Sequence, residues 1–222
     1  MGMRKNFTHI TAGVHDEISA VTTDEGRFYQ SPKGRYPSVT TVTGWEKRKF
    51  FAEWRKNNRM ESKRVLDRGN CLHESIEEYL KNEEQYLYED CGMENKVMFD
   101  QIEPLLEKID NIHALEVPLW SSTLRLAGRV DCVAEYNGKL SIIDFKGSTR
   151  AKEERNITNY FAQGCAYSIM WQERTKTPID QVVILISSED GIAQEFVKPV
   201  NRYVPVLKQM IEYYHKDNLQ TV

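Results

Sequence analysis

The chain has 222 residues, of which 40% are hydrophobic and 28% are charged, and its formal net charge at pH 7 is −3. No apolar run is long enough to cross a membrane, and the N-terminal residues lack the apolar core of a secretory signal. The length suits one domain spanning residues 1–222, and the net charge argues against nucleic-acid binding by overall charge alone.

The cysteines are widely spaced along the chain. They are Cys71, Cys91, Cys132 and Cys165, and none forms a C-x-x-C pair. This spacing suggests neither a zinc ribbon nor an iron–sulfur set. We therefore expect reduced thiols, as in an intracellular protein.

The first forty residues are typical of strands and turns, punctuated by Gly26, Gly34 and Pro37. A helix is expected from about Thr43, following a possible N-cap region at 38–42. Its aromatic face consists of Trp45, Phe50, Phe51 and Trp54. We expect most of these rings to pack in the core, with stacking against bases as the lesser alternative.

Charge is distributed unevenly over the helical half of the chain. Residues 45–68 hold nine Lys/Arg and four acidic residues, net +5, whereas residues 82–110 hold nine acidic residues and two lysines, net −7. Either run could be the solvated face of a helix. Alternatively, the basic run could follow a phosphate backbone.

The periodicity predicts two further helices, at about 67–81 and 94–110, and Pro104 should kink the second or mark its boundary. Residues 43–110 thus form a helical portion, and about 111–222 form a sheet core. The elements expected there are strands at 112–120, 123–136, 139–146, 180–187 and 192–197, and helices at 157–173 and 202–215. We predict an α/β fold with a central mixed sheet flanked by helices.

The most informative feature is a predicted hairpin with the turn Asn137-Gly138. A two-residue turn sets Tyr136 against Lys139, which puts Asp131 opposite Asp144 and puts Lys146 on the same face. Opposed carboxylates, with Cβ atoms about 4.5–5.5 Å apart, repel each other. The strand at 139–146 is apolar enough to be buried, so its charges are costly unless they are paired or bound to a cation. Solvated charges at strand ends are the alternative.

Other candidate residues surround this hairpin. Arg68-Gly69 is expected to open the second helix, so a phosphate could bind at its N-terminus. His73 and Glu77 share one face of that helix, and the imidazole could join two aspartates around a metal, although a lone histidine is more often structural. Glu116 is either an extra ligand or a rim charge, and we favour the rim.

Polar side chains that follow the hairpin could hold a phosphate backbone. Ser148 comes two residues after Lys146, and Gln163 and Tyr167 are four apart on the next helix. An ordinary amphipathic helix, with the Tyr167 ring packed in the core, is the alternative.

Together these segments resemble the PD-(D/E)XK nuclease superfamily. The likeness is greatest to its RecB-type exonuclease branch, especially the mitochondrial genome maintenance exonucleases and their phage relatives. The matching segments run in the expected order and cover most of the chain. They are Tyr36-Pro37-Ser38-Val39-Thr40, Arg68-Gly69 with His73 and Glu77, Gly128-Arg129-Val130-Asp131, Ile143-Asp144-Phe145-Lys146 and Gln163-Gly164-Cys165-Ala166-Tyr167.

The resemblance implies a restriction-endonuclease-like core and a metal-dependent DNA exonuclease that prefers single-stranded ends. The implied catalytic residues are Asp131, Asp144 and Lys146. One or two Mg²⁺ or Mn²⁺ ions would be held by His73, Asp131, Asp144 and the Phe145 carbonyl. The implied substrate-binding residues are Arg68, Ser148, Gln163 and Tyr167.

Two alternatives remain open. One is an endonuclease of the same superfamily, directed by structure or sequence, and the other is a catalytically silent nucleic-acid-binding subunit. A helical arch at residues 43–81 that admits a free end would favour the exonuclease.

Some expectations concern cofactors, partners and location. Some RecB-type relatives hold an iron–sulfur cluster with an N-terminal cysteine and a C-terminal cysteine group. No cysteine follows Cys165 here, so the resemblance implies no such cluster in this chain. There is no P-loop, so a helicase or other replication, repair or recombination protein would have to unwind DNA. We expect no membrane association, and a cytoplasmic phage or bacterial enzyme, with a mitochondrial origin open.

Overall fold

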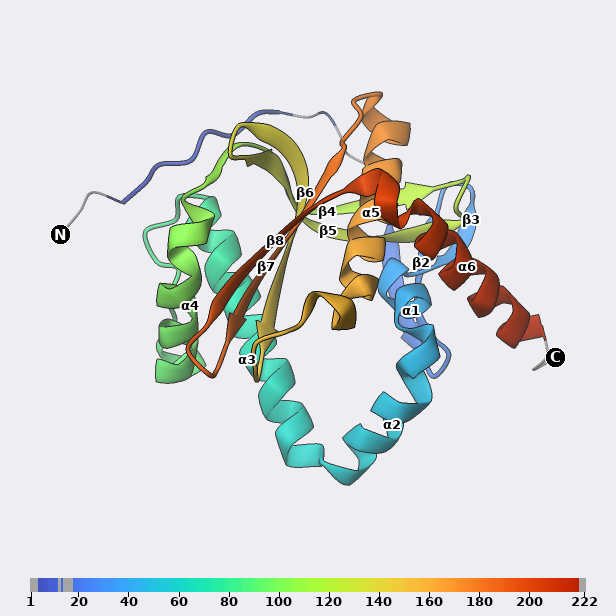
Figure 1. The fold of residues 1–222 in the computed structure, drawn as a ribbon, viewed down its shortest axis with the longest axis horizontal. Coiled ribbons are helices and arrows are strands. Elements are labelled where there is room, and N and C mark those ends of the chain that lie inside the picture. The colour runs from blue at the N-terminus through green and yellow to red at the C-terminus, as the bar shows by residue number, and fades with distance from the viewer. Residues whose placement is uncertain (1–3, 12, 14–17, 220–222) are drawn as a thin grey trace.

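A five-stranded mixed sheet forms the centre of the computed structural model, which describes residues 4–11, 13 and 18–219 (Figure 1). Its order is β4-β5-β6-β7-β8, with β6 and β7 parallel and the other neighbours antiparallel. The strands are β4 (Ile109–Ser121), β5 (Leu126–Tyr136), β6 (Lys139–Ser148), β7 (Gln181–Ser188) and β8 (Ala193–Pro199). The predicted mixed sheet is therefore confirmed.

A second, antiparallel sheet comes from the N-terminal region and has the order β1-β2-β3. Its strands are β1 (Ser19–Thr23), β2 (Gly26–Ser31) and β3 (Gly34–Pro37). The α-helices are α1 (Val39–Thr43), α2 (Arg48–Asn57), α3 (Arg59–Leu80), α4 (Gly92–Leu106), α5 (Thr158–Thr175) and α6 (Val204–Leu219). Short 3-10 helices are η1 (Trp45–Lys47), η2 (Glu89–Cys91), η3 (Glu154–Asn156) and η4 (Val200–Tyr203).

Helices cover both faces of the five-stranded sheet (Figure 1). Successive residues of a strand point to opposite faces, so Ile142 packs with α5 while Ile143 packs with α3 and α4. In β7, Ile184 and Leu185 likewise pack on opposite faces of the sheet. The near-continuous apolar run of β7 is thus explained by burial on both faces.

Two glycines allow the close packing of α5. A Cβ at Gly164 would overlap the Val182 side chain, and a Cβ at Gly128 would overlap the Tyr167 ring. Helix α5 therefore lies tightly against β7, and Tyr167 lies tightly against β5.

The second predicted helix starts earlier than expected, at Arg59 instead of 67. Its first two turns show no apolar stripe because they do not reach the core: Met60 is 86% exposed and Leu66 is 62% exposed. Gly69 therefore lies inside α3, where the backbone N–H groups are bonded within the helix, and the expected phosphate site at a helix N-terminus is wrong. Among the residues described, even this 22-residue helix falls short of what a membrane crossing requires, and no other helix meets it.

The helix expected from Thr43 is divided into α1, η1 and α2, with Gly44 at the first break. None of the ten residues of α2 is buried, and Phe50 and Phe51 are 65% and 45% exposed. The expectation that these rings pack in the core is therefore wrong, whereas Trp45 in η1 is buried.

Several boundaries differ from the prediction by a few residues. Helix α4 ends at Leu106, two residues after Pro104, so Ile109 can already pair with Tyr136 in the sheet. Strand β5 starts at 126, because residues 122–125 form a turn.

Cys71 and Cys91 form a disulfide that joins α3 to η2. This corrects the expectation of four reduced thiols. Cys132 and Cys165 are free and buried.

Candidate active site

The central hairpin has the predicted register. Tyr136 pairs with Lys139, and the ladder continues to the pair Cys132 and Ile143. It ends one pair before Asp131 and Asp144. There the Asp131 carboxylate accepts a hydrogen bond from the backbone N–H of Phe145 at 3.0 Å. A side chain thus takes over a backbone donor of β6 at the point where the two strands stop pairing.

Asp144 and Lys146 form a buried ion pair at this end of β6. Lys146 Nζ lies 2.7 Å from Asp144 Oδ1 and 2.6 Å from Oδ2, and Asp144 is 2% exposed. Burial raises the pKa of Asp144 to about 7, with Asp131 adding to the rise and Lys146 opposing it. Burial alone would lower the pKa of Lys146, but Asp144 and Asp131 outweigh it and raise that pKa.

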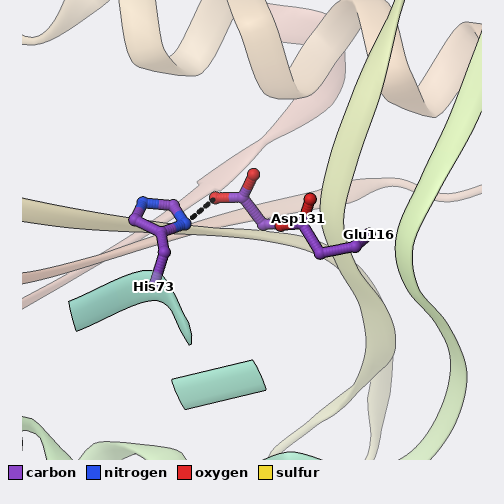
Figure 2. A group of neighbouring side chains, drawn as sticks. All are labelled: His73, Glu116 and Asp131. Carbon is purple, nitrogen blue, oxygen red and sulfur yellow. Dashed lines mark ion pairs between the residues drawn. The ribbon is translucent and has the colours of Figure 1, made fainter. Parts of the chain in front are cut away.

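His73 approaches the hairpin from α3. Its Nδ1 atom lies 3.8 Å from Asp131 Oδ2, and the dashed line in Figure 2 marks this ion pair. Burial lowers the pKa of His73 despite the opposing effect of Asp131. The imidazole is therefore biased toward its neutral form, which is the form that binds a metal ion.

Glu116 on β4 joins these two residues. One ligand atom from each of His73, Glu116 and Asp131 lies within 4.8 Å of the others (Figure 2). Burial raises the pKa of Glu116 to about 8, and Asp131 and Glu77 contribute to the rise. The structure thus places Glu116 inside the cluster, not at the rim that the sequence favours.

The predicted metal ligands are only partly brought together. Within the described part of the chain, His73, Glu116 and Asp131 meet the spacing expected of a metal group. Asp144 is instead paired with Lys146. The ligand roles of Asp144 and of the Phe145 carbonyl therefore stay predictions.

A pocket of about 670 Å³ opens over the cluster. Gln163 and Tyr167 line it, as the sequence suggests, together with Lys146. Its lining carries charges of both signs. The positive side chains include Arg27 of β2 and Arg129 of β5, and the negative ones include Glu74 and Glu77 of α3. The full lining is Arg27, Tyr29, Ser38, Thr40, Asn70, His73, Glu74, Glu77, Glu116, Gly128, Arg129, Asp131, Lys146, Gln163 and Tyr167.

Two predicted substrate-binding residues do not line this pocket. Arg68 is buried and forms an ion pair with Glu189. The Ser148 hydroxyl donates to the Arg150 carbonyl at 2.7 Å. Conversely, Arg27 and Tyr29 of β2 were missed, because the first forty residues show turns and strands but no motif that places them beside the hairpin.

Comparisons with known proteins agree with this architecture. The human and mouse mitochondrial genome maintenance exonuclease 1 are 30% and 32% identical to the chain over 129 and 106 residues. These matches cover 52% and 46% of this chain, and 38% and 28% of the relatives, so the chain spans well under half of their length.

The structural likeness extends to a protein from Eubacterium rectale assigned as an exonuclease. Its TM-score is 0.51 at 12% identity, over 71% of this chain and 66% of that one, which supports the predicted restriction-endonuclease-like core. A model of the PD-(D/E)XK nuclease superfamily matches residues 42–219, which include every element from α2 to α6 and all the catalytic candidates. The chain therefore belongs to the PD-(D/E)XK nuclease superfamily.

Proposed function

We propose that the protein is a metal-dependent DNA exonuclease that degrades single-stranded DNA from a free end. The observation that carries this proposal is the convergence of His73, Asp131 and Lys146 on one pocket, with Asp144 paired to Lys146 behind it. Membership of a nuclease superfamily and the likeness to proteins named exonucleases support it.

The donor set fits a divalent cation. His73 and Asp131 offer one nitrogen and carboxylate oxygens, and Asp144 is a further candidate ligand next to them. Such a set suits Mg²⁺, and the imidazole makes Mn²⁺ acceptable as well. When bound, the cation lowers the pKa of a water molecule and neutralises charge that develops on the phosphate.

Lys146 has a defined role in this proposal. In the metal-free protein, Asp144 and Asp131 raise the pKa of Lys146 and favour its ammonium form. That ammonium group would donate hydrogen bonds that orient water and stabilise negative charge in the transition state, whereas a cation bound beside it would lower the pKa and make a role as general base available. The ring of Tyr160, 5.3 Å from Nζ, helps to hold Lys146 in place.

The rest of the pocket would position the strand. Arg27 and Arg129 offer positive charge to phosphates, and Gln163 and Tyr167 offer polar groups next to Lys146. The Tyr29 ring is buried and its centre lies 5.5 Å from the Arg27 guanidinium carbon, which helps to hold this arginine in place. The acidic residues Glu74 and Glu77 of α3 repel phosphates, so we expect the strand to contact the residues of β2 and β5.

A helical arch that admits only a free end would favour end-directed cleavage over an internal cut. Helix α2 and the first turns of α3 project from the layered core and bend back to it like an arch (Figure 1). Exposed Phe50 and Phe51 and the exposed cations Lys49, Arg55 and Lys56 lie on α2. Bases stack on exposed rings and phosphates attract cations, which suits a single strand that passes beside α2.

The test compares linear and circular single-stranded DNA of the same sequence, in Mg²⁺, in Mn²⁺ and in chelator. We expect the linear substrate to be degraded with either metal, the circle to survive, and chelator to stop the reaction. A Lys146→Ala protein that still binds DNA should be inactive. Cutting of the circle would identify an endonuclease, and binding without cleavage by the unaltered protein would identify a silent subunit.

A further inference from the structure

We propose that Glu116 is a ligand of the divalent cation that His73 and Asp131 hold. The inference rests on the proposed function, because it presumes that the pocket takes up a metal ion. It names a residue outside the motifs Gly-Arg-Val-Asp and Asp-Phe-Lys that mark the rest of the site.

The strand register brings Glu116 to Asp131. Leu115 pairs with Cys132, and Val117 pairs with Val130. These pairs bracket Glu116 and Asp131, which therefore face each other across β4 and β5. Two carboxylates in opposed positions repel each other when both are ionised, and a cation between them removes that repulsion.

Neither Lys146 nor Arg129 compensates both carboxylates. Lys146 Nζ is committed to Asp144, with 2.7 and 2.6 Å to the two oxygens. Arg129 Nε lies 3.9 Å from Glu116 Oε2, beyond hydrogen-bond distance, and its side chain is 52% exposed. A half-exposed guanidinium at that distance is screened by water and compensates the carboxylate weakly.

The spacing of the donor atoms fits a single ion. Atoms that bind one cation at about 2.0–2.6 Å can lie no more than about 4–5 Å apart. The donor atoms of His73, Glu116 and Asp131 lie within 4.8 Å of one another. They come from α3, β4 and β5, so three separate elements converge at this point (Figure 2).

The backbone at Glu116 is unusual for a strand. Its φ angle is +50°, in the left-handed region that a residue with a side chain rarely adopts. Arg125 and Asn137, which share this conformation, are in turns, and Asn111 adopts it near the start of β4, where the register shifts. Glu116 instead lies in the middle of β4, and this local twist accompanies the placement of its carboxylate beside Asp131.

The experiment is a titration of the DNA-free protein with Mn²⁺, in which free Mn²⁺ is measured by electron paramagnetic resonance. We compare the unaltered chain with Glu116→Gln and Glu77→Gln. The Glu77→Gln control makes the same substitution in the lining of the same pocket, but Glu77 pairs with Lys81 and is not in the ligand group. We expect Glu116→Gln to weaken Mn²⁺ binding about tenfold or more, and Glu77→Gln to weaken it less than about threefold.

The possible results separate the role of Glu116 as a ligand from the proposed nuclease function. Equal Mn²⁺ affinity in Glu116→Gln and the unaltered protein, or an equal loss in both variants, would overturn the role of Glu116 as a ligand. If Glu116→Gln does not fold, Glu116→Asp replaces it and should also weaken binding, since the shorter side chain withdraws the oxygen. An unaltered protein that binds Mn²⁺ but cuts no DNA would refute the proposed function without touching this inference.

Discussion

The end of β6 and helix α2 both carry charged side chains, but these side chains differ in their exposure to water. Asp144 and Lys146 are desolvated and held in a fixed pair, whereas Lys49, Arg55 and Lys56 stand in water. A desolvated pair has a fixed geometry and shifted pKa values, which suits chemistry on a reacting group. Solvated charges are mobile and screened, which suits attraction of a long anion. Under the proposed function, this contrast divides the molecule into a reacting part at the end of β6 and a binding part on α2.

The sharpest test of this division is Lys146→Ala. Loss of one preorganised donor at a reacting phosphate should lower the cleavage rate about 10²–10³-fold, while DNA affinity in chelator stays within about twofold. The matched control is Lys139→Ala, an exposed lysine at the other end of β6. Cleavage and single-strand binding are measured on one oligonucleotide, and near-normal turnover in Lys146→Ala would remove this residue from the site.

A second test concerns the rigidity of the reacting part. In Gly164→Ala the new Cβ would overlap Val182, so α5 must move away from β7. Overpacking of this kind should lower the free energy of unfolding by about 1–3 kcal/mol, measured by denaturant titration. The control is Gly69→Ala in α3, where a Cβ meets no neighbour and should stabilise the helix by up to about 1 kcal/mol. A neutral Gly164→Ala would show that this contact is not a tight constraint.

A third test removes the rings of the binding part. The double variant Phe50→Ala and Phe51→Ala should weaken single-strand binding by about 1–3 kcal/mol, because a base loses a ring to stack on. Stability should change by less than about 1 kcal/mol, since both rings are exposed. Tyr213→Ala, another exposed ring, on α6, serves as control. Unchanged affinity measured by fluorescence anisotropy would separate α2 from DNA binding.

The smallest expected effect is a pH dependence of the metal-free protein. Glu116 and Asp144 have pKa values raised to about 8 and about 7, so the folded state holds protons that the unfolded state releases. Their contribution to stability is therefore present below the ordinary carboxyl pKa and is lost as the pH rises toward 8. The melting temperature without metal should fall from pH 5 to pH 8.5, and Mn²⁺ should restore it at pH 8.5.

Glu116→Gln isolates one of the two groups in that experiment. The variant should show a shallower fall in melting temperature with pH, because its amide does not titrate. An equally steep fall would assign the dependence to groups elsewhere.

The sequence predicts best where local rules decide the structure. Asn137-Gly138 specifies a two-residue turn, and the register follows from it down to Cys132 and Ile143. The motif at Gln163 and Tyr167 likewise reaches the pocket, because helical spacing puts both residues on one face. The positions of Asp131 and Asp144, which follow the last pair, depend on how the two strands separate. The residues of the turn do not determine that separation.

The sequence fails where distant segments meet. Glu116 lies beside His73 and Asp131 and has a positive φ angle in the middle of β4, and no propensity predicts a positive φ for glutamate there. The early start of α3 was missed because its first turns, including Met60, have no core to face and so show no apolar stripe. Tertiary packing, and not local propensity, therefore determines the position of Glu116 and the start of α3.

The most direct test of the central claim is anomalous diffraction from crystals soaked in Mn²⁺. We predict a peak within bonding distance of His73 and Asp131, with Glu116 as a third ligand. A peak bound elsewhere, or no peak here under conditions in which the dissolved protein cleaves DNA, would contradict the assignment of this pocket as the metal site of the nuclease.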